Sequence, residues 1–115
     1  MSDRDPGCIF CKIATGELHD KTRFAYEDEL VAVFADLHPI APVHLLLVPK
    51  KHYSDLNGLT QADEPVYGRI VRVASTLAKK FAIDRTGWQL FVRVGKGGGQ
   101  EVGHVHFHLI SGKRA

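Results

Sequence analysis

Three histidines alternate with apolar residues near the end of the chain, in the stretch HVHFHLI (104–110). Successive residues of a strand point to opposite faces, so a strand here sets His104, His106 and His108 in a row on one face. Strand residues two apart are separated by roughly 6.6 Å and residues four apart by roughly 13 Å. A zinc ion bonded at about 2.0–2.1 Å to each nitrogen could take neighbours in this row, but hardly both ends. The histidines are therefore expected to serve at least two purposes.

Nucleophilic catalysis is one such purpose, because a neutral imidazole attacks through one nitrogen while a hydrogen bond holds the other. The preceding stretch GKGGGQE (95–101) supplies glycines, whose backbone N–H groups can approach an anion closely. Together the loop and the histidine row indicate chemistry at phosphorus. The alternative interpretation is a flexible loop followed by a chance row of exposed or core histidines.

The elements that must position these residues are predicted from hydrophobic spacing. Apolar residues fall every three or four positions from Val66 to Phe81, which predicts a long helix over 66–81. A short helix is expected over 8–14, closed by Gly16. Only Asp28 and Glu29 separate the first two strand-like runs, which indicates a tight hairpin. The predicted strands are 23–27, 30–36, 44–49, 88–94 and 104–110. The fold class is therefore α+β, with a five-stranded antiparallel sheet, one long helix and a short N-terminal helix.

Composition limits the classes of protein to consider. The chain has 115 residues, a net charge of +2 and 44% hydrophobic residues, which predicts a single domain over 1–115. Its two lysine pairs are separated and lack interleaved aromatic residues, which disfavours a nucleic-acid surface. No apolar run is long enough to span a membrane. The polar first ten residues do not resemble a secretory signal, so a cytoplasmic location is expected.

Three segments of the sequence resemble one known family. GGQEVGHVHFHLI (98–110) resembles the signature of the histidine-triad (HIT) superfamily, and ADLHPIAPVHLLLVPKKH (35–52) and CIFCKIATGE (8–17) resemble its upstream blocks. The best match is the Hint-like branch of nucleotide-binding hydrolases. The resemblance implies a HIT-like fold, a homodimer, and cleavage of the P–N bond of nucleoside 5′-phosphoramidates. Adenosine is the nucleoside that the resemblance favours.

The resemblance also assigns catalytic roles by position. It implies that His106 is the nucleophile and forms a nucleotidyl-histidine intermediate, which water then hydrolyses. His108 would bond the α-phosphate or the leaving group, and His44 would orient the histidine row. Gln100 would reach the phosphate or leaving-group side.

The nucleotide-binding residues implied by the family lie on both sides of the histidines. Asp36 matches the acidic residue that holds ribose hydroxyls, although a turn-forming role suits it equally. Phe34 and Leu37 are as compatible with a plain core position as with a base pocket. Arg93 stands where the family commonly has asparagine, and Glu101 stands where many members have serine, which leaves the leaving-group preference open. The base would contact Ile9, Phe10, Phe34 and Leu37, and the phosphate would lie near Gly99, Glu101 and Arg93.

A structural zinc site is a second implication of the resemblance. Some bacterial members with a C-x-x-C pair bind zinc through positions that correspond here to Cys8, Cys11, His52 and His104. Two cysteines and two histidines make a closed tetrahedral set, which is typical of structural zinc. The alternative is that the cysteines are small buried hydrophobes and His52 a surface residue. His19 and His38 are expected to be exposed loop histidines.

Two other functions stay open from the sequence. One is a dinucleoside polyphosphate hydrolase or nucleotidyltransferase, which uses the same histidine chemistry. The other is a nucleotide-binding or protein-interaction module whose turnover is incidental.

Overall fold

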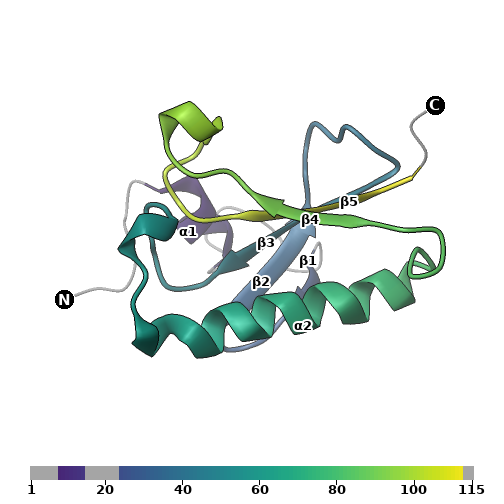
Figure 1. The fold of residues 1–115 in the computed structure, drawn as a ribbon, viewed down its shortest axis with the longest axis horizontal. Coiled ribbons are helices and arrows are strands. Elements are labelled where there is room, and N and C mark those ends of the chain that lie inside the picture. The colour runs from purple at the N-terminus through teal and green to yellow at the C-terminus, as the bar shows by residue number, and fades with distance from the viewer. Residues whose placement is uncertain (1–7, 15–23, 113–115) are drawn as a thin grey trace.

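The computed structural model describes residues 8–14 and 24–112, and its centre is one antiparallel sheet (Figure 1). Five strands lie in the order β1-β2-β3-β5-β4, and each neighbouring pair is antiparallel. The predicted α+β class is confirmed. The elements are α1 (Ile9–Ala14), β1 (Phe24–Glu27), β2 (Val31–Ala35), β3 (Val43–Pro49), the short 3₁₀ turns η2 (Leu56–Gly58) and η3 (Gln61–Asp63), α2 (Glu64–Lys80), β4 (Gln89–Val92), η4 (Lys96–Gly98) and β5 (Phe107–Ser111).

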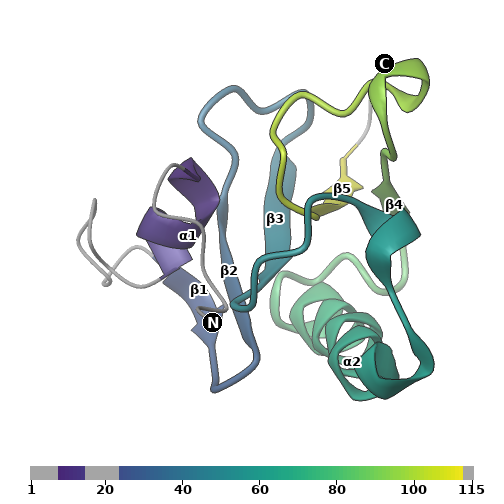
Figure 2. The same cartoon turned by 90° about the vertical axis from the view of Figure 1, so that its left-hand side faces the viewer.

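The two faces of the sheet carry different helices, as Figure 2 shows. Alternate residues of a strand point to opposite faces, so Val33 and Leu47 lie in the core shared with α2, whereas Phe34 and Val48 lie in the cluster that contains α1. On β5, Leu109 belongs to the core on the α2 side. His108, one residue earlier, therefore lies on the α1 face. His44 of β3 lies on this second face as well, because its neighbour Leu45 belongs to the core on the α2 side.

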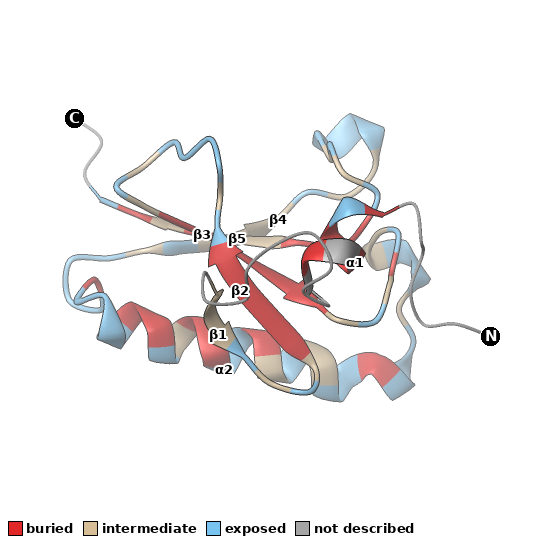
Figure 3. Cartoon of the chain, turned by 180° about the vertical axis from the view of Figure 1, so that it is seen from behind, coloured by how far each residue is buried: buried red, intermediate tan, exposed pale blue. Residues whose placement is uncertain are grey.

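Helix α2 is the predicted long helix, and it begins two residues earlier than its apolar spacing indicates. Pro65 occupies its first turn, where a missing N–H costs nothing. A buried stripe faces the sheet, as Figure 3 shows, and consists of Ile70, Val73, Ala74, Leu77 and Ala78. Within the described residues, no helix has both the length and the apolar character needed to cross a bilayer.

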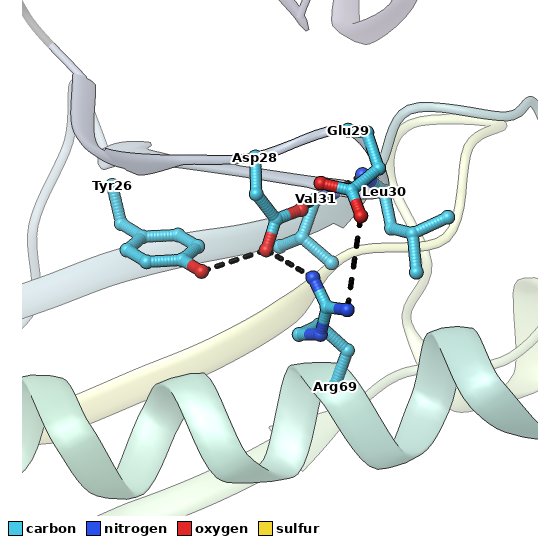
Figure 4. A network of polar contacts seen from close by, with 6 residues as sticks. All are labelled: Tyr26, Asp28, Glu29, Leu30, Val31 and Arg69. Atoms are coloured by element: carbon cyan, nitrogen blue, oxygen red, sulfur yellow. Dashed lines mark hydrogen bonds and ion pairs between the residues drawn. The ribbon is translucent and has the colours of Figure 1, made fainter.

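The turn between β1 and β2 is tied to Arg69 of α2 by the carboxylates of Asp28 and, at 3.9 Å, Glu29 (Figure 4). Asp28 accepts hydrogen bonds from the backbone N–H groups of Leu30 and Val31, from the Tyr26 hydroxyl at 2.7 Å, and from Arg69 of α2. Burial alone raises the pKa of Asp28, but these hydrogen bonds outweigh it and lower the pKa to about 2. The predicted hairpin is confirmed, and these contacts hold its turn against α2.

The last strand begins at Phe107, so the prediction that it begins at His104 is wrong. Continuing the β3–β5 register beyond the Leu47–Phe107 pair sets Val105 across from Pro49, which has no N–H to donate. The Val105 carbonyl therefore has no donor at Pro49, and the Val105 N–H bonds to the carbonyl of Tyr53, at 2.7 Å. Thus His104 lies in a bend and His106 in the irregular segment just before β5, and of the three histidines only His108 lies within the strand.

The remaining boundaries shift by one or two residues at strand ends. The structure places strands at Val31–Ala35, Val43–Pro49 and Gln89–Val92, where the sequence predicts 30–36, 44–49 and 88–94. His38 is exposed in a loop, as predicted. The predictions for Gly16 and His19 lie outside the described residues.

Candidate functional site

Two cysteines and two histidines converge where α1 meets the end of β3 and the segment before β5. We call Cys8, Cys11, His52 and His104 the cysteine–histidine set. Their ligand atoms all lie within 4.8 Å of one another. The Nδ1 atom of His104 lies 3.2 Å from Cys8 Sγ, 3.4 Å from Cys11 Sγ and 3.2 Å from His52 Nδ1. A tetrahedral zinc sets its sulfur and nitrogen ligands roughly 3.3–3.8 Å apart, so this spacing fits a metal of that kind.

The surroundings of His104 also fit a metal ligand. Its Nε2 atom lies 2.9 Å from the carbonyl oxygen of Pro49. A carbonyl can only accept, so Nε2 carries the proton and Nδ1 presents a lone pair to the sulfur atoms. Burial lowers the pKa of His104 to about 4, which keeps the ring neutral at physiological pH. The Cys11 N–H also points to Cys8 Sγ, at 3.4 Å. The predicted ligands are therefore together, in a form that can hold a metal.

A second polar group lies farther along the same face, where β2, β3 and β5 are neighbours. We call Asp36, His44 and His108 the carboxylate–histidine set; their ligand atoms also lie within 4.8 Å of one another. His44 Nε2 lies 2.9 Å from His108 Nδ1 and 3.3 Å from Asp36 Oδ2. The other oxygen of Asp36 accepts the His38 N–H at 3.0 Å. Asp36 thus forms the predicted turn and also faces a histidine, and its contact with ribose hydroxyls stays a prediction.

The direction of the hydrogen bonds in this set follows from one backbone group. The Ile40 N–H donates to His44 Nδ1 at 3.1 Å, so in the neutral ring the proton is on Nε2. This proton points to Nδ1 of His108, which leaves the His108 proton on its own Nε2. Burial lowers the pKa of His44 and lowers the pKa of His108 to about 4, while the charge of Asp36 opposes both shifts. Both rings are therefore neutral at physiological pH.

His106 lies between the two sets and is held differently from both. Its Nδ1 atom lies 2.8 Å from the backbone carbonyl of His104, so the proton is on Nδ1 and Nε2 has a lone pair. The ring packs edge-to-face on Phe10, with centroids 4.9 Å apart, and its centroid lies 5.1 Å from that of His108. The residue is buried, with 7% exposure. It presents an unprotonated nitrogen from a fixed ring.

The residues predicted to hold a base lie around α1 and the end of β2. Phe10 and Phe34 are buried and touch edge-to-face, with centroids 5.7 Å apart. Ile9 and Leu37 are 48% and 83% exposed, which is unusual for large apolar side chains. Two aromatic rings and two exposed aliphatic residues thus adjoin the face that carries His106 and Asp36.

The glycine-rich loop is closed by Gln100, whose amide is fully engaged. Its Oε1 accepts the Gly95 N–H at 2.8 Å, and its Nε2 donates to the carbonyls of Ser54 at 2.6 Å and Val102 at 2.9 Å. A direct contact with phosphate would require one of these bonds to be exchanged, so that role of Gln100 stays a prediction. Its observed contribution is to fix the loop shape.

Sequence comparison identifies the family. The family model described as the HIT domain matches residues 17–115. The chain belongs to the HIT family. This confirms the resemblance drawn from the sequence motifs.

Several relatives of this HIT protein match along nearly their whole length. Protein HitA of Neisseria gonorrhoeae is 40% identical over 103 residues, which cover 90% of this chain and 94% of that protein. The purine nucleoside phosphoramidase of Escherichia coli strain K12 is 35% identical over 105 residues, which cover 91% and 87%. A crystallised histidine triad protein from Clostridium difficile is 41% identical, with a TM-score of 0.91 and coverage of 97% and 96%.

Sequence reasoning missed one ring that contacts a site histidine of this HIT protein. Phe91 of β4 stacks on His108, with centroids 4.7 Å apart and an interplanar angle of 11°. The signal was the alternation within QLFVR (89–93), which places Phe91 and Arg93 on one face once a strand is assumed. Arg93 is the residue directly after β4, and its guanidinium lies over the Phe91 ring. Glu101 is exposed on the glycine-rich loop.

Proposed function

We propose that this HIT protein is a hydrolase that cleaves the P–N bond of purine nucleoside 5′-phosphoramidates. The observation that carries the proposal is the hydrogen bond from His106 Nδ1 to the His104 carbonyl, which leaves Nε2 as a nucleophile. The name of the Escherichia coli relative, a purine nucleoside phosphoramidase, supports this choice of substrate.

The first chemical step joins His106 to phosphorus. The Nε2 lone pair attacks the α-phosphorus, the Nε2–P bond forms, and the bond from phosphorus to the leaving nitrogen breaks. His108 carries its proton on Nε2 because its Nδ1 accepts from His44. That N–H donates a hydrogen bond to the leaving nitrogen, which takes up one proton from solvent as the P–N bond breaks and departs as an amine.

The second step restores the enzyme. Water attacks phosphorus, the Nε2–P bond breaks, and the electron pair returns to His106. The proton lost by water passes to solvent, and the second product is a nucleoside monophosphate. Asp36 and His44 act as positioning residues for His108, through the 3.3 Å and 2.9 Å contacts described above.

The nucleoside would occupy the side of the site formed by α1 and β2. Phe10 and Phe34 offer aromatic edges, Leu37 and Ile9 offer exposed apolar surface, and Asp36 offers a carboxylate oxygen to ribose hydroxyls. An aromatic and apolar wall suits a purine ring.

The cysteine–histidine set would hold a structural zinc. Two thiolates and two imidazoles complete the tetrahedral shell and leave no position for water, so the ion would supply folding energy and no catalysis. It would join α1 to the segment just before β5. A homodimer and a cytoplasmic location remain predictions from the sequence.

The nucleophile is tested with His106→Ala. Wild type should release amine and nucleoside monophosphate from an adenosine phosphoramidate, and the variant should lose at least about 10³-fold in kcat while still binding AMP. Substitution of the exposed His38 by alanine is the matched control and should keep wild-type turnover.

Two further results decide the reaction class. Rapid quench of wild type in alkaline denaturant with radiolabelled nucleotide should recover label on the protein, because a phosphorus–imidazole bond survives alkali but not acid, and continued turnover by His106→Ala would refute the nucleophile. Preferred cleavage of diadenosine polyphosphates in the same assay would favour the rival hydrolase, and binding without turnover would favour the binding module.

A further inference from the structure

One cation, Arg93, lies at the β4 edge of the sheet, close to the site histidines and away from the proposed nucleoside wall. Arg93 directly follows β4, and the paired residues of β4 and β5 include Phe91 with His108 and Val92 with Phe107. Arg93 and His106 each lie one residue beyond the last pair of this ladder, so they are neighbours in its continuation.

The side chain of Arg93 is held in place by apolar contacts. Its guanidinium carbon lies 5.2 Å from the centre of the Phe91 ring, which itself stacks on His108. Its stem runs beneath the glycine loop, where a Cβ added to Gly99 would lie 3.5 Å from the Arg93 Cδ. Arginine therefore bridges the loop and the aromatic stack.

The charge of Arg93 has no partner in residues 8–14 and 24–112, where it forms no ion pair with any carboxylate. Glu101 lies on the same loop but is not paired with it. The residue is exposed, so the five N–H donors remain available to an anion. Its positive charge also acts to lower the pKa of His108 and His44, as expected for a cation close to both rings.

The order of strands sets the direction of a bound substrate. The proposed nucleoside residues belong to α1 and β2, on one side of β5, whereas Arg93 and the glycine loop lie at β4 on the other side. A phosphoramidate with its nucleoside on the first side and phosphorus at His106 therefore extends its amine toward β4.

We propose that Arg93 selects phosphoramidates whose leaving amine carries a carboxylate or a similar anionic group. This inference rests on the proposed function and names its substrate class. Arginine binds a carboxylate through two parallel N–H bonds, so the free guanidinium fits an amino-acid-like leaving group better than an alkylamine. The bonds that form and break at phosphorus are those given above.

Three adenosine 5′-phosphoramidates test the proposal, made from β-alanine, propylamine and 1,3-diaminopropane. They have leaving groups of similar length that are anionic, neutral and cationic. Wild type should show a kcat/KM about tenfold higher for the β-alanine compound than for the propylamine compound. This ratio corresponds to the free energy that one charge-assisted hydrogen bond contributes. The diaminopropane compound should be the poorest substrate.

The variants assign the preference to one side chain. Arg93→Gln should reduce the β-alanine to propylamine ratio to about one, and Arg93→Lys should keep part of it because charge remains without the planar fork. Lys96→Gln removes an equal charge from η4 of the same loop and should keep the wild-type ratio.

Each contrary result has a distinct meaning. A wild-type ratio of one or less, an unchanged ratio in Arg93→Gln, or an equal loss in Lys96→Gln would overturn the role of Arg93 while propylamine turnover still upholds the proposed function. An equal fall for all three substrates in Arg93→Gln would assign Arg93 to the phosphate and also overturn selection. Failure of wild type to cleave any compound would refute the proposed function, and this inference with it.

Discussion

The cysteine–histidine set and the carboxylate–histidine set each gather potential metal ligands within 4.8 Å on the same face of the sheet. They differ in what touches the far nitrogen of the histidine. His104 faces the Pro49 carbonyl, an acceptor, so its lone pair points into its set. His44 faces the Ile40 N–H, a donor, so its proton points into its set. One backbone group at each ring thus decides whether the set presents electron pairs or a hydrogen.

This difference carries a chemical consequence. A metal on His44 Nε2 would require the proton to move to Nδ1, where it would meet the Ile40 N–H. Such a conflict between two donors disfavours metal at the carboxylate–histidine set. The cysteine–histidine set has no such conflict at His104. Proximity of ligand atoms alone therefore does not separate a metal site from a hydrogen-bonded relay.

Removal of a sulfur ligand should give the largest effect. We expect Cys11→Ser to reduce bound zinc from about one per chain to near zero and to lower the free energy of unfolding by several kcal/mol, since metal binding is coupled to folding. His108→Ala, in the other set, should retain the zinc. Metal analysis and denaturant unfolding at neutral pH measure both, and a second tightly bound zinc in wild type would contradict the comparison.

Substitution of His44 should change activity without changing metal content. We expect His44→Ala to lower kcat for a phosphoramidate by about 10²-fold, because His108 then loses the donor that fixes its protonation. His44→Gln should recover part of the rate, since its amide N–H can donate in place of Nε2. Zinc content should equal that of wild type in both variants. Equal loss in the two variants would contradict the donor role, because the glutamine amide would then fail to replace the Nε2–H of His44.

The sequence predicted which residues lie together in the site more reliably than which groups form hydrogen bonds with them. Strand spacing predicted that the ends of the histidine row, His104 and His108, serve different purposes, and the C-x-x-C spacing grouped Cys8 with Cys11, because both patterns follow from local geometry. The start of the last strand was wrong because Pro49, distant in sequence, interrupts the ladder at Val105. The partners of His44 and His104 are backbone groups of Ile40 and Pro49. Any residue type supplies a carbonyl, and all but proline an N–H, so these contacts leave no signal in the sequence.

The last prediction concerns the smallest difference, which is the position of one proton on each histidine ring. It tests the comparison between the two sets most directly. Long-range ¹H–¹⁵N NMR near pH 7 should show His44 and His108 protonated at Nε2 and His106 protonated at Nδ1. Because the pKa of His108 is lowered to about 4 by burial, it should gain its second proton only as the pH falls toward 4, below the usual range near 6.5. Exposed His38 provides the internal reference. Protonation of His44 at Nδ1 would remove the distinction between the two sets, because its Nε2 would then be as able to bind a metal as His104 Nδ1.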